Sequence, residues 1–278
     1  MIIKVEDIEF NILIDEKKLK PENTPVVFLH GFTGSANDWQ FIFDKLPSSF
    51  VPIAIDLIGH GKSSSPDNIK YYSTEAIVSQ LDKIFKKLDI EKLILIGYSM
   101  GGRAALSYCL KHNHKIIAAV LESTTAGILD FNERKERVEL DFLLAERIKI
   151  EGVEKFLEYW FSIPLFESLK NNKNLDELKN QRISNNVIGL SNTLSGFSTG
   201  LMPDYWNKLK EIQFPVMLIS GSLDQKYTNI NSKMAKLITN CRHEIIEQCG
   251  HNIHLENPEL FTKLVCNFLI SIELQKVK

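Results

Sequence analysis

The sequence predicts an α/β fold with a mostly parallel, doubly wound sheet that carries a helical insertion. Short runs of consecutive apolar residues, typical of strands buried on both faces, alternate with helical segments along most of the chain. Residues 127–209 contain no good strand pattern, and the alternation resumes after them. A chain of 278 residues is long enough for a single domain over residues 1–278 with an inserted helical lid at residues 127–209.

The first part of the chain predicts the start of this sheet. Residues 2–14 alternate loosely and indicate one or two antiparallel edge strands. Buried-type strands follow at residues 26–29, 51–55, 93–96 and 116–121, with helices at 37–46, at 73–88 and after Gly102. Ser73 is the expected N-cap of the second helix. This β-α-β order with short turns predicts a ligand site at the carboxyl ends of the parallel strands.

The rest of the chain predicts the insertion and the end of the sheet. Helices are expected inside the insertion at residues 133–150, 153–161 and 175–187. After it come a strand at 215–220, a helix at 229–238, a strand at 242–246 and a closing helix at 258–274. Pro258 suits the first turn of that last helix, where its missing N–H is not needed.

Composition excludes several classes of function. The net charge of −2 gives no electrostatic basis for binding nucleic acid or an anionic membrane. The four cysteines form no CxxC pair, so neither a zinc site nor a disulfide framework is expected. The N-terminal segment is charged where a signal peptide is apolar, and no apolar run spans a bilayer. We expect a cytoplasmic protein without a cofactor; the sequence leaves its oligomeric state open.

One short segment organises the predicted site. Gly97-Tyr98-Ser99-Met100-Gly101 lies between a buried-type strand and an Ala-containing helix. This Gly-x-Ser-x-Gly pattern is typical of a nucleophile elbow, a strained strand-to-helix turn that exposes a serine oxygen above the sheet edge. An ordinary turn is the alternative, but the flanking strand and helix favour the elbow.

A serine in such a turn needs a histidine to take its proton and a carboxylate to orient that histidine. Ser99, Asp224 and His251 occur in the chain order that this kind of fold uses, and each follows a predicted strand. Asp224 alone could be a turn cap. His254 is a rival to His251, which we favour because it follows Gly250 directly in the loop.

Two further groups of candidates surround the serine. The backbone N–H groups of Phe32 and Met100 are expected to bind an oxyanion, because their positions in the topology match that role. Arg103, in the first turn after the serine, suggests an anionic substrate, since the helix dipole disfavours a cation there. Arg134 and Arg137 lie one turn apart, but Glu133 and Arg137 also fit an ordinary solvated pair.

Taken together, these motifs resemble the α/β-hydrolase superfamily over the whole chain, and most of all the 2-succinyl-6-hydroxy-2,4-cyclohexadiene-1-carboxylate synthases of menaquinone biosynthesis. The elbow and the histidine loop are common across the superfamily, whereas the insertion motifs are particular. The motifs are residues 29–35 with Trp39, 97–103, Glu122-Ser123, Glu133-Arg134-x-x-Arg137 with Asp141 and Leu144-Ala145, Trp160 with 164–166, 196–200 with Pro203 and Trp206, 221–224, and Gly250-His251-Asn252-x-His254-x-Glu256-x-Pro258. Ile58 and Ala126 depart from it, since that family usually has proline at both loop positions.

The resemblance implies a lyase that eliminates pyruvate from 2-succinyl-5-enolpyruvyl-6-hydroxy-3-cyclohexene-1-carboxylate. Ser99 would then act as a base that removes a ring proton. It also implies that Arg103, Arg137 and Arg182 grip the carboxylates of a small anionic substrate, while Tyr98 and Trp160 shape the pocket. Forked, permanently charged guanidinium groups suit such a substrate. The role of Arg134 stays undecided.

Two other functions remain open at this point. A cytosolic carboxylester or carbon–carbon bond hydrolase would use the same triad with Ser99 as the nucleophile. A ligand-binding protein without catalysis would have no need for all three triad residues, so the intact triad disfavours it.

Overall fold

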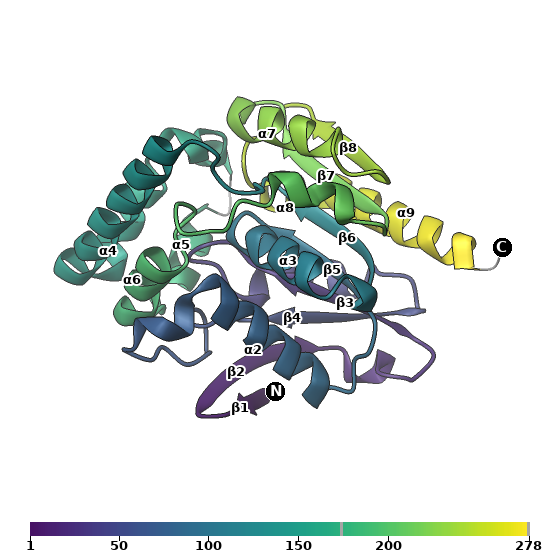
Figure 1. Cartoon of the computed structure of the whole chain (residues 1–278). Helices are drawn as coiled ribbons and strands as arrows, with labels where there is room; N and C mark the ends of the chain where they lie inside the picture. The colour runs from purple at the N-terminus through teal and green to yellow at the C-terminus, as the bar shows by residue number, and fades with distance from the viewer. Residues whose placement is uncertain (173–174, 277–278) are drawn as a thin grey trace.

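An eight-stranded sheet in the order β1-β2-β4-β3-β5-β6-β7-β8 forms the centre of the molecule (Figure 1). The computed structural model describes residues 1–172 and 175–276. The strands are β1 (Ile2–Val5), β2 (Ile8–Ile14), β3 (Thr24–Leu29), β4 (Phe50–Ile55), β5 (Leu93–Tyr98), β6 (Ile116–Glu122), β7 (Val216–Gly221) and β8 (Cys241–Ile246). Only the β1–β2 and β2–β4 pairs of this sheet are antiparallel. The predicted mostly parallel sheet with antiparallel strands at its start is confirmed.

The sheet builds one apolar core on each face, because successive side chains of a strand point to opposite sides. In β3, Val27 and Leu29 belong to one core, whereas Val26 and Phe28 belong to the other. The first core includes side chains from α2 (Thr74–Lys87), α3 (Met100–Lys111) and α7 (Gln225–Ala235). The second includes side chains from α1 (Gln40–Phe43), α8 (Ile253–Glu256) and α9 (Pro258–Lys276). Helices on both faces make the fold doubly wound.

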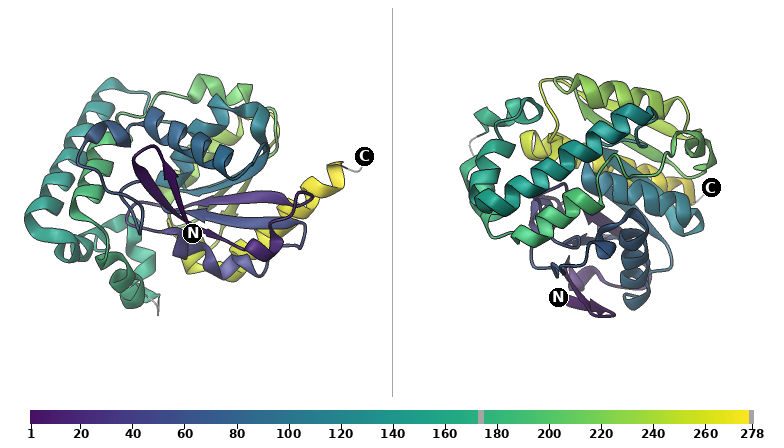
Figure 2. Two further views of the ribbon diagram at one scale, coloured as in Figure 1. Left: turned by 90° about the horizontal axis from the view of Figure 1, so that it is seen from below. Right: turned by 60° about the vertical axis from the view of Figure 1, so that its left-hand side comes forward.

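Between β6 and β7 the chain leaves the sheet and forms α4 (Phe131–Trp160), α5 (Leu175–Ile183) and α6 (Val187–Gly196). These helices lie beyond one end of the sheet, on the left in Figure 1 and in the left-hand view of Figure 2. They have a core of their own, to which Ile148, Phe156 and Leu190 contribute. The last residues of β5 and β6, Tyr98 and Glu122, are paired, so the insertion leaves the sheet beside Ser99. The inserted helices therefore lie over the carboxyl edge of the sheet.

Short 3-10 helices complete the described part of the chain. They are η1 (Glu16–Lys18), η2 (Ala36–Trp39), η3 (Ile69–Tyr72), η4 (Asn113–Lys115), η5 (Pro164–Asn171) and η6 (Trp206–Glu211). The helix predicted at residues 37–46 is therefore a 3-10 turn followed by the single turn of α1.

Other predicted helix boundaries also need correction. The helices expected at residues 133–150 and 153–161 run together as α4, with a break at Gly152, where φ is 79°. The helix expected at residues 175–187 ends at Ile183, and α6 begins anew because the Asn186 side chain caps it by accepting from two backbone N–H groups. Helix α7 starts at Gln225 rather than at residue 229, because Asp224 caps it.

Candidate active site

The turn between β5 and α3 holds Ser99 in a strained conformation. Its φ of 48° and ψ of −104° lie where a residue with a Cβ is rarely found. A Cβ at Gly97 would lie 2.5 Å from the Gly101 carbonyl oxygen, and one at Gly101 would collide with the backbone of Leu29. The Ser99 N–H donates a 2.8 Å hydrogen bond to the Glu122 carbonyl oxygen at the end of β6. The turn therefore needs both glycines and presents Ser99 at the carboxyl edge of the sheet.

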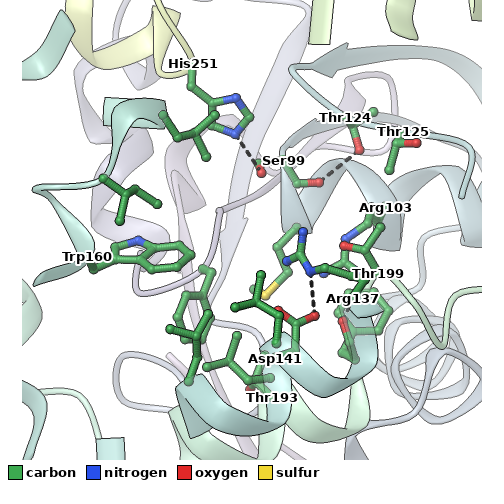
Figure 3. A pocket seen from close by; sticks show the side chains of 18 of the residues that line it. Ser99, Arg103, Thr124, Thr125, Arg137, Asp141, Trp160, Thr193, Thr199 and His251 are labelled. Carbon is green, nitrogen blue, oxygen red and sulfur yellow. Dashed lines mark hydrogen bonds and ion pairs between the residues drawn. The ribbon is translucent and has the colours of Figure 1, made fainter. Parts of the chain in front are cut away.

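His251 and Asp224 reach Ser99 from the loops after β8 and β7. His251 Nε2 lies 3.0 Å from Ser99 Oγ, as the dashed line in Figure 3 shows. His251 Nδ1 lies 2.6 Å from Asp224 Oδ2, and both side chains are buried. A neutral imidazole that donates from Nδ1 to the carboxylate keeps a lone pair at Nε2 for the serine proton. The three residues predicted from chain order thus form one hydrogen-bonded series.

The rival histidine, His254, lies elsewhere. Its Nδ1 is 2.9 Å from Glu122 Oε2, and its ring stacks on Trp39 with 4.6 Å between ring centres. Both partners are fully buried, so the His254 side chain is committed to packing beneath the site. This placement agrees with the choice of His251.

A cavity of about 190 Å³ opens in front of Ser99, between the sheet and the inserted helices. Figure 3 shows Trp160 on one side of it and Arg103, Arg137 and Thr199 on the other. The Trp160 ring packs against Phe32 with 5.3 Å between centres. The cavity therefore combines an apolar, aromatic wall with a positively charged one, which suits a ligand with an apolar ring and an anionic group.

Arg103 forms part of the charged wall from the first turn of α3. Its Nη1 donates a 2.8 Å hydrogen bond to the Phe197 carbonyl oxygen, and its guanidinium lies 4.4 Å from the centre of the Phe197 ring. Burial lowers the pKa of Arg103 to about 10, so the side chain stays charged at neutral pH. Within residues 1–172 and 175–276, its Nε and Nη2 have no protein acceptor. They remain free for a ligand.

Arg137 reaches the same wall from α4. Its Nε donates a 2.8 Å hydrogen bond to Asp141 Oδ2, which also accepts a 2.6 Å bond from Ser198 Oγ. Burial opposes the charge of Arg137, but Asp141 outweighs it and raises the pKa. Only Nε is bonded among the described groups. The terminal nitrogens of the fork therefore have no protein acceptor and can bind a carboxylate.

The structure does not bring Arg182 to this cavity, which corrects the expectation taken from the resemblance. Its Nη2 lies 3.0 Å from Asp38 Oδ2 and its Nη1 lies 3.3 Å from Asp38 Oδ1, and both side chains are almost fully buried. A guanidinium fork that already holds a buried carboxylate cannot bind a second one in the same geometry. Arg134, left undecided by the sequence, is also absent from the cavity wall.

Phe32, from the loop after β3, and Met100, the residue after Ser99, both line the cavity. In the described part of the chain, neither backbone N–H donates to a protein acceptor. Two free donors beside a serine hydroxyl can stabilise negative charge on a substrate oxygen. Tyr98, also in the wall, donates its hydroxyl hydrogen bond to Asn252 Oδ1 in the histidine loop.

Comparisons with known proteins agree with this geometry. The family described as alpha/beta hydrolase fold matches residues 24–258. A Bacillus subtilis (strain 168) protein, named with a qualification as a 2-succinyl-6-hydroxy-2,4-cyclohexadiene-1-carboxylate synthase, is 45% identical over 89% of this chain and 90% of its own. An Enterobacter sp. (strain 638) protein with that name unqualified is 33% identical over 86% of this chain and 89% of its own. The solved structure of MenH from S. aureus is 32% identical, with a TM-score of 0.88, over 95% of this chain and 98% of that one.

The chain belongs to the 2-succinyl-6-hydroxy-2,4-cyclohexadiene-1-carboxylate synthase family of α/β-hydrolase-fold enzymes. A thermophilic esterase from Thermogutta terrifontis shares the fold, with a TM-score of 0.84 at 23% identity. The fold is thus shared with a hydrolase, and fold alone does not decide which reaction is catalysed.

Sequence reasoning missed two wall residues of this synthase-family site. Asp141 is one of them, although its spacing of four from Arg137 on one helix predicts the ion pair that orients the guanidinium. Tyr227 was not singled out, because a tyrosine in the first turn of a helix carries no signal in a single sequence. In the structure it borders the cavity, and its ring centre lies 4.6 Å from that of His251.

Proposed function

We propose that this enzyme eliminates pyruvate from 2-succinyl-5-enolpyruvyl-6-hydroxy-3-cyclohexene-1-carboxylate to give 2-succinyl-6-hydroxy-2,4-cyclohexadiene-1-carboxylate in menaquinone biosynthesis. Membership of the synthase family supports this reaction. The observation that carries it is the pair Arg103 and Arg137 in the wall of a cavity that also holds Ser99 and His251. An enzyme for uncharged esters has no use for two guanidinium groups with free donors in the wall of its cavity.

The proposed chemistry begins with Ser99 as a base. Its Oγ gives its proton to His251 Nε2, 3.0 Å away, and takes the ring proton next to the succinyl carbonyl. The electron pair of the broken C–H bond moves toward that carbonyl oxygen, where the N–H groups of Phe32 and Met100 stabilise the charge. The pair then shifts through the ring double bond and breaks the C–O bond to the enolpyruvyl group.

The leaving group departs as enolpyruvate, which takes up a proton and becomes pyruvate. The charge that forms on His251 is balanced by Asp224, 2.6 Å from its Nδ1. No oxidant, metal or cofactor is needed for this balance. The ring gains its second double bond from the same electron pair, which accounts for the 2,4-diene in the product.

The substrate in this proposal is a small molecule with several carboxylates. Arg103 and Arg137 bind two of its carboxylate oxygens through their free donors, and the aromatic wall around Trp160 holds the ring. Residues 127–209 act as a lid over a single domain, because their helices supply Arg137 and Trp160 to the cavity. Arg182 supports this lid rather than binding substrate.

The cytoplasm is the proposed location. All four cysteines are free, which suits a reducing compartment. None of the helices within residues 1–172 and 175–276 has the length and apolar character needed to cross a membrane.

Incubating the protein with the cyclohexene intermediate and following pyruvate release tests the proposed reaction. Catalysed release, well above the spontaneous rate, is expected. The alternative is a carboxylester or carbon–carbon bond hydrolase, which the same Ser99–His251 contact would serve with Ser99 as nucleophile. Rapid turnover of a small neutral ester with a burst of acyl-enzyme, and no pyruvate release above background, would replace the lyase with that hydrolase.

A further inference from the structure

The carboxylate of Asp224 contacts both Tyr227 and the catalytic His251. The Tyr227 backbone N–H donates a 3.1 Å hydrogen bond to Asp224 Oδ1, while Asp224 Oδ2 lies 2.6 Å from His251 Nδ1. The Tyr227 and His251 rings are also packed together, with 4.6 Å between centres. A shift of the acid would therefore move the imidazole and the tyrosine together, which fixes the position of the phenol relative to Ser99.

The hydroxyl of Tyr227 is an uncommitted donor at the charged wall. The side chain is half-buried and borders the same cavity as Arg103 and Arg137. Within residues 1–172 and 175–276, this hydroxyl has no protein hydrogen-bond partner. Burial raises the pKa of Tyr227 although Arg137 and Arg103 oppose the rise, so the group keeps its proton at neutral pH. A protonated phenol beside two cations can donate a hydrogen bond to an anionic ligand, but it does not itself supply the negative charge that the cations attract.

We propose that the Tyr227 hydroxyl is the third donor of the anion site and hydrogen-bonds the substrate carboxylate that Arg103 and Arg137 hold beside His251. The identity of the substrate rests on the proposed function, but the binding of a carboxylate does not. The two arginines supply charge, and the phenol adds a donor whose position is fixed relative to the imidazole. The phenol thereby favours substrates whose carboxylate lies beside His251, the residue that takes part in proton transfer.

The variant Tyr227→Phe tests this role, because it removes one oxygen and keeps the ring that packs on His251. Succinate alone serves as the direct probe, measured by titration calorimetry. Loss of a hydrogen bond to a charged group predicts succinate binding about 10- to 100-fold weaker, and a similar rise in KM for the cyclohexene intermediate with a smaller change in kcat. Tyr71→Phe is the matched control, since its hydroxyl bonds Asp7 at the surface. It should change neither quantity.

A second measurement separates substrate binding from an effect on the triad. An uncharged fluorophosphonate that reacts with Ser99 reports on the triad without using the anion site. Its rate of reaction should stay within about twofold of wild type in Tyr227→Phe. Unchanged succinate affinity and KM, or a fluorophosphonate rate that falls together with turnover, would overturn the proposal and make Tyr227 a packing partner of His251.

The outcome for the anion site is independent of the outcome for the reaction. If the wild-type enzyme releases no pyruvate but Tyr227→Phe still weakens succinate binding, the proposed function fails while the third donor stands. If pyruvate is released and Tyr227→Phe behaves like wild type in both assays, the reverse holds.

Discussion

At the scale of single residues, the left-handed backbone of Ser99 has a measurable consequence. Conformations of this kind cost about 1–3 kcal/mol for a residue with a Cβ, and glycine avoids most of that cost. Ser99→Gly should therefore unfold at a higher denaturant concentration than Ser99→Ala. Both variants should lose at least about 1,000-fold in pyruvate release, because each removes the hydroxyl. Equal stability of the two variants would show that the turn is not strained.

Arg137 can be tested against Arg147, which makes the same kind of ion pair on the same helix but lies over the Tyr159 ring instead of bordering the cavity. Arg137 bonds Asp141 and Arg147 bonds Glu151, each through Nε at 2.8 Å and each four residues apart. Only Arg137 borders the cavity. Arg137→Ala should raise KM for the intermediate by about 10- to 100-fold through loss of a charge-assisted bond, while Arg147→Ala leaves it unchanged. Steady-state kinetics of pyruvate release measure both, and equal effects would remove Arg137 from the anion site.

Among single residues, chain order was enough to predict which side chains meet, because Ser99, Asp224 and His251 each follow a strand that ends at the same sheet edge. Arg182 shows the limit of that reasoning. Its helix position was known, but its partner Asp38 lies 144 residues away, and no local pattern predicts that the two meet. Tyr227 shows a second limit, because a tyrosine in the first turn of a helix carries no signal in a single sequence.

At the scale of elements, the Arg182–Asp38 pair joins α5 of the insertion to η2, the 3-10 helix that follows β3. Removing one partner of a buried pair leaves the other charge unpaired, which costs about 3–5 kcal/mol. Arg182→Met should lower the free energy of unfolding by that amount in urea denaturation. Lys149→Met breaks an exposed pair with Glu146 on α4 and should cost less than about 1 kcal/mol. Full stability with weaker substrate binding in Arg182→Met would return Arg182 to the substrate site.

Elements with strong local signals were predicted well. Helix α2 begins after Ser73, whose side chain accepts from the Ala76 N–H as a cap should, and all the buried-type strands exist. The insertion was harder, because its helices pack on one another and not on the sheet. The break between α5 and α6 depends on Asn186 acting as an N-cap. A single asparagine within a helical pattern does not predict that a new helix begins there.

At the scale of the whole molecule, two buried histidines predict how stability depends on pH. Burial lowers the pKa of His30, and burial together with His30 lowers the pKa of His60 further. Below about pH 6.5 the unfolded chain then binds more protons than the folded one. The contribution of these two histidines to the free energy of unfolding is therefore complete above that pH and is lost as pH falls. Urea denaturation at pH 7.5 and 5.5 should show a lower free energy of unfolding at pH 5.5.

The contribution of His60 to this pH dependence of the free energy of unfolding can be measured separately. Each histidine that stays neutral in the fold contributes a slope of up to about 1.4 kcal/mol per pH unit. His60→Gln should reduce the slope between pH 7.5 and 5.5 by up to that amount. A slope identical to that of the wild-type protein would mean that His60 accepts a proton without loss of stability.

The fold class followed from the alternation of apolar runs and helices, whereas the detailed strand order did not. The pairing of β2 with β4, through Ile12↔Ile55 and Ile14↔Ile53, puts an antiparallel strand next to a parallel one. Nothing within residues 8–14 specifies that partner, since register depends on the hydrophobic faces of both strands.

Residues 127–209 leave the sheet after β6 and return at β7, and these two strands are hydrogen-bonded neighbours from Ala119↔Val216 to Glu122↔Ile219. The departure and the return are therefore close together, and the ladder between the strands closes whatever the excursion contains. A change of residues within the excursion therefore leaves this strand pairing and the triad of Ser99, Asp224 and His251 in place. It alters the part of the cavity wall that holds Arg137 and Trp160, provided that the Arg182 partner of the buried Asp38 is kept.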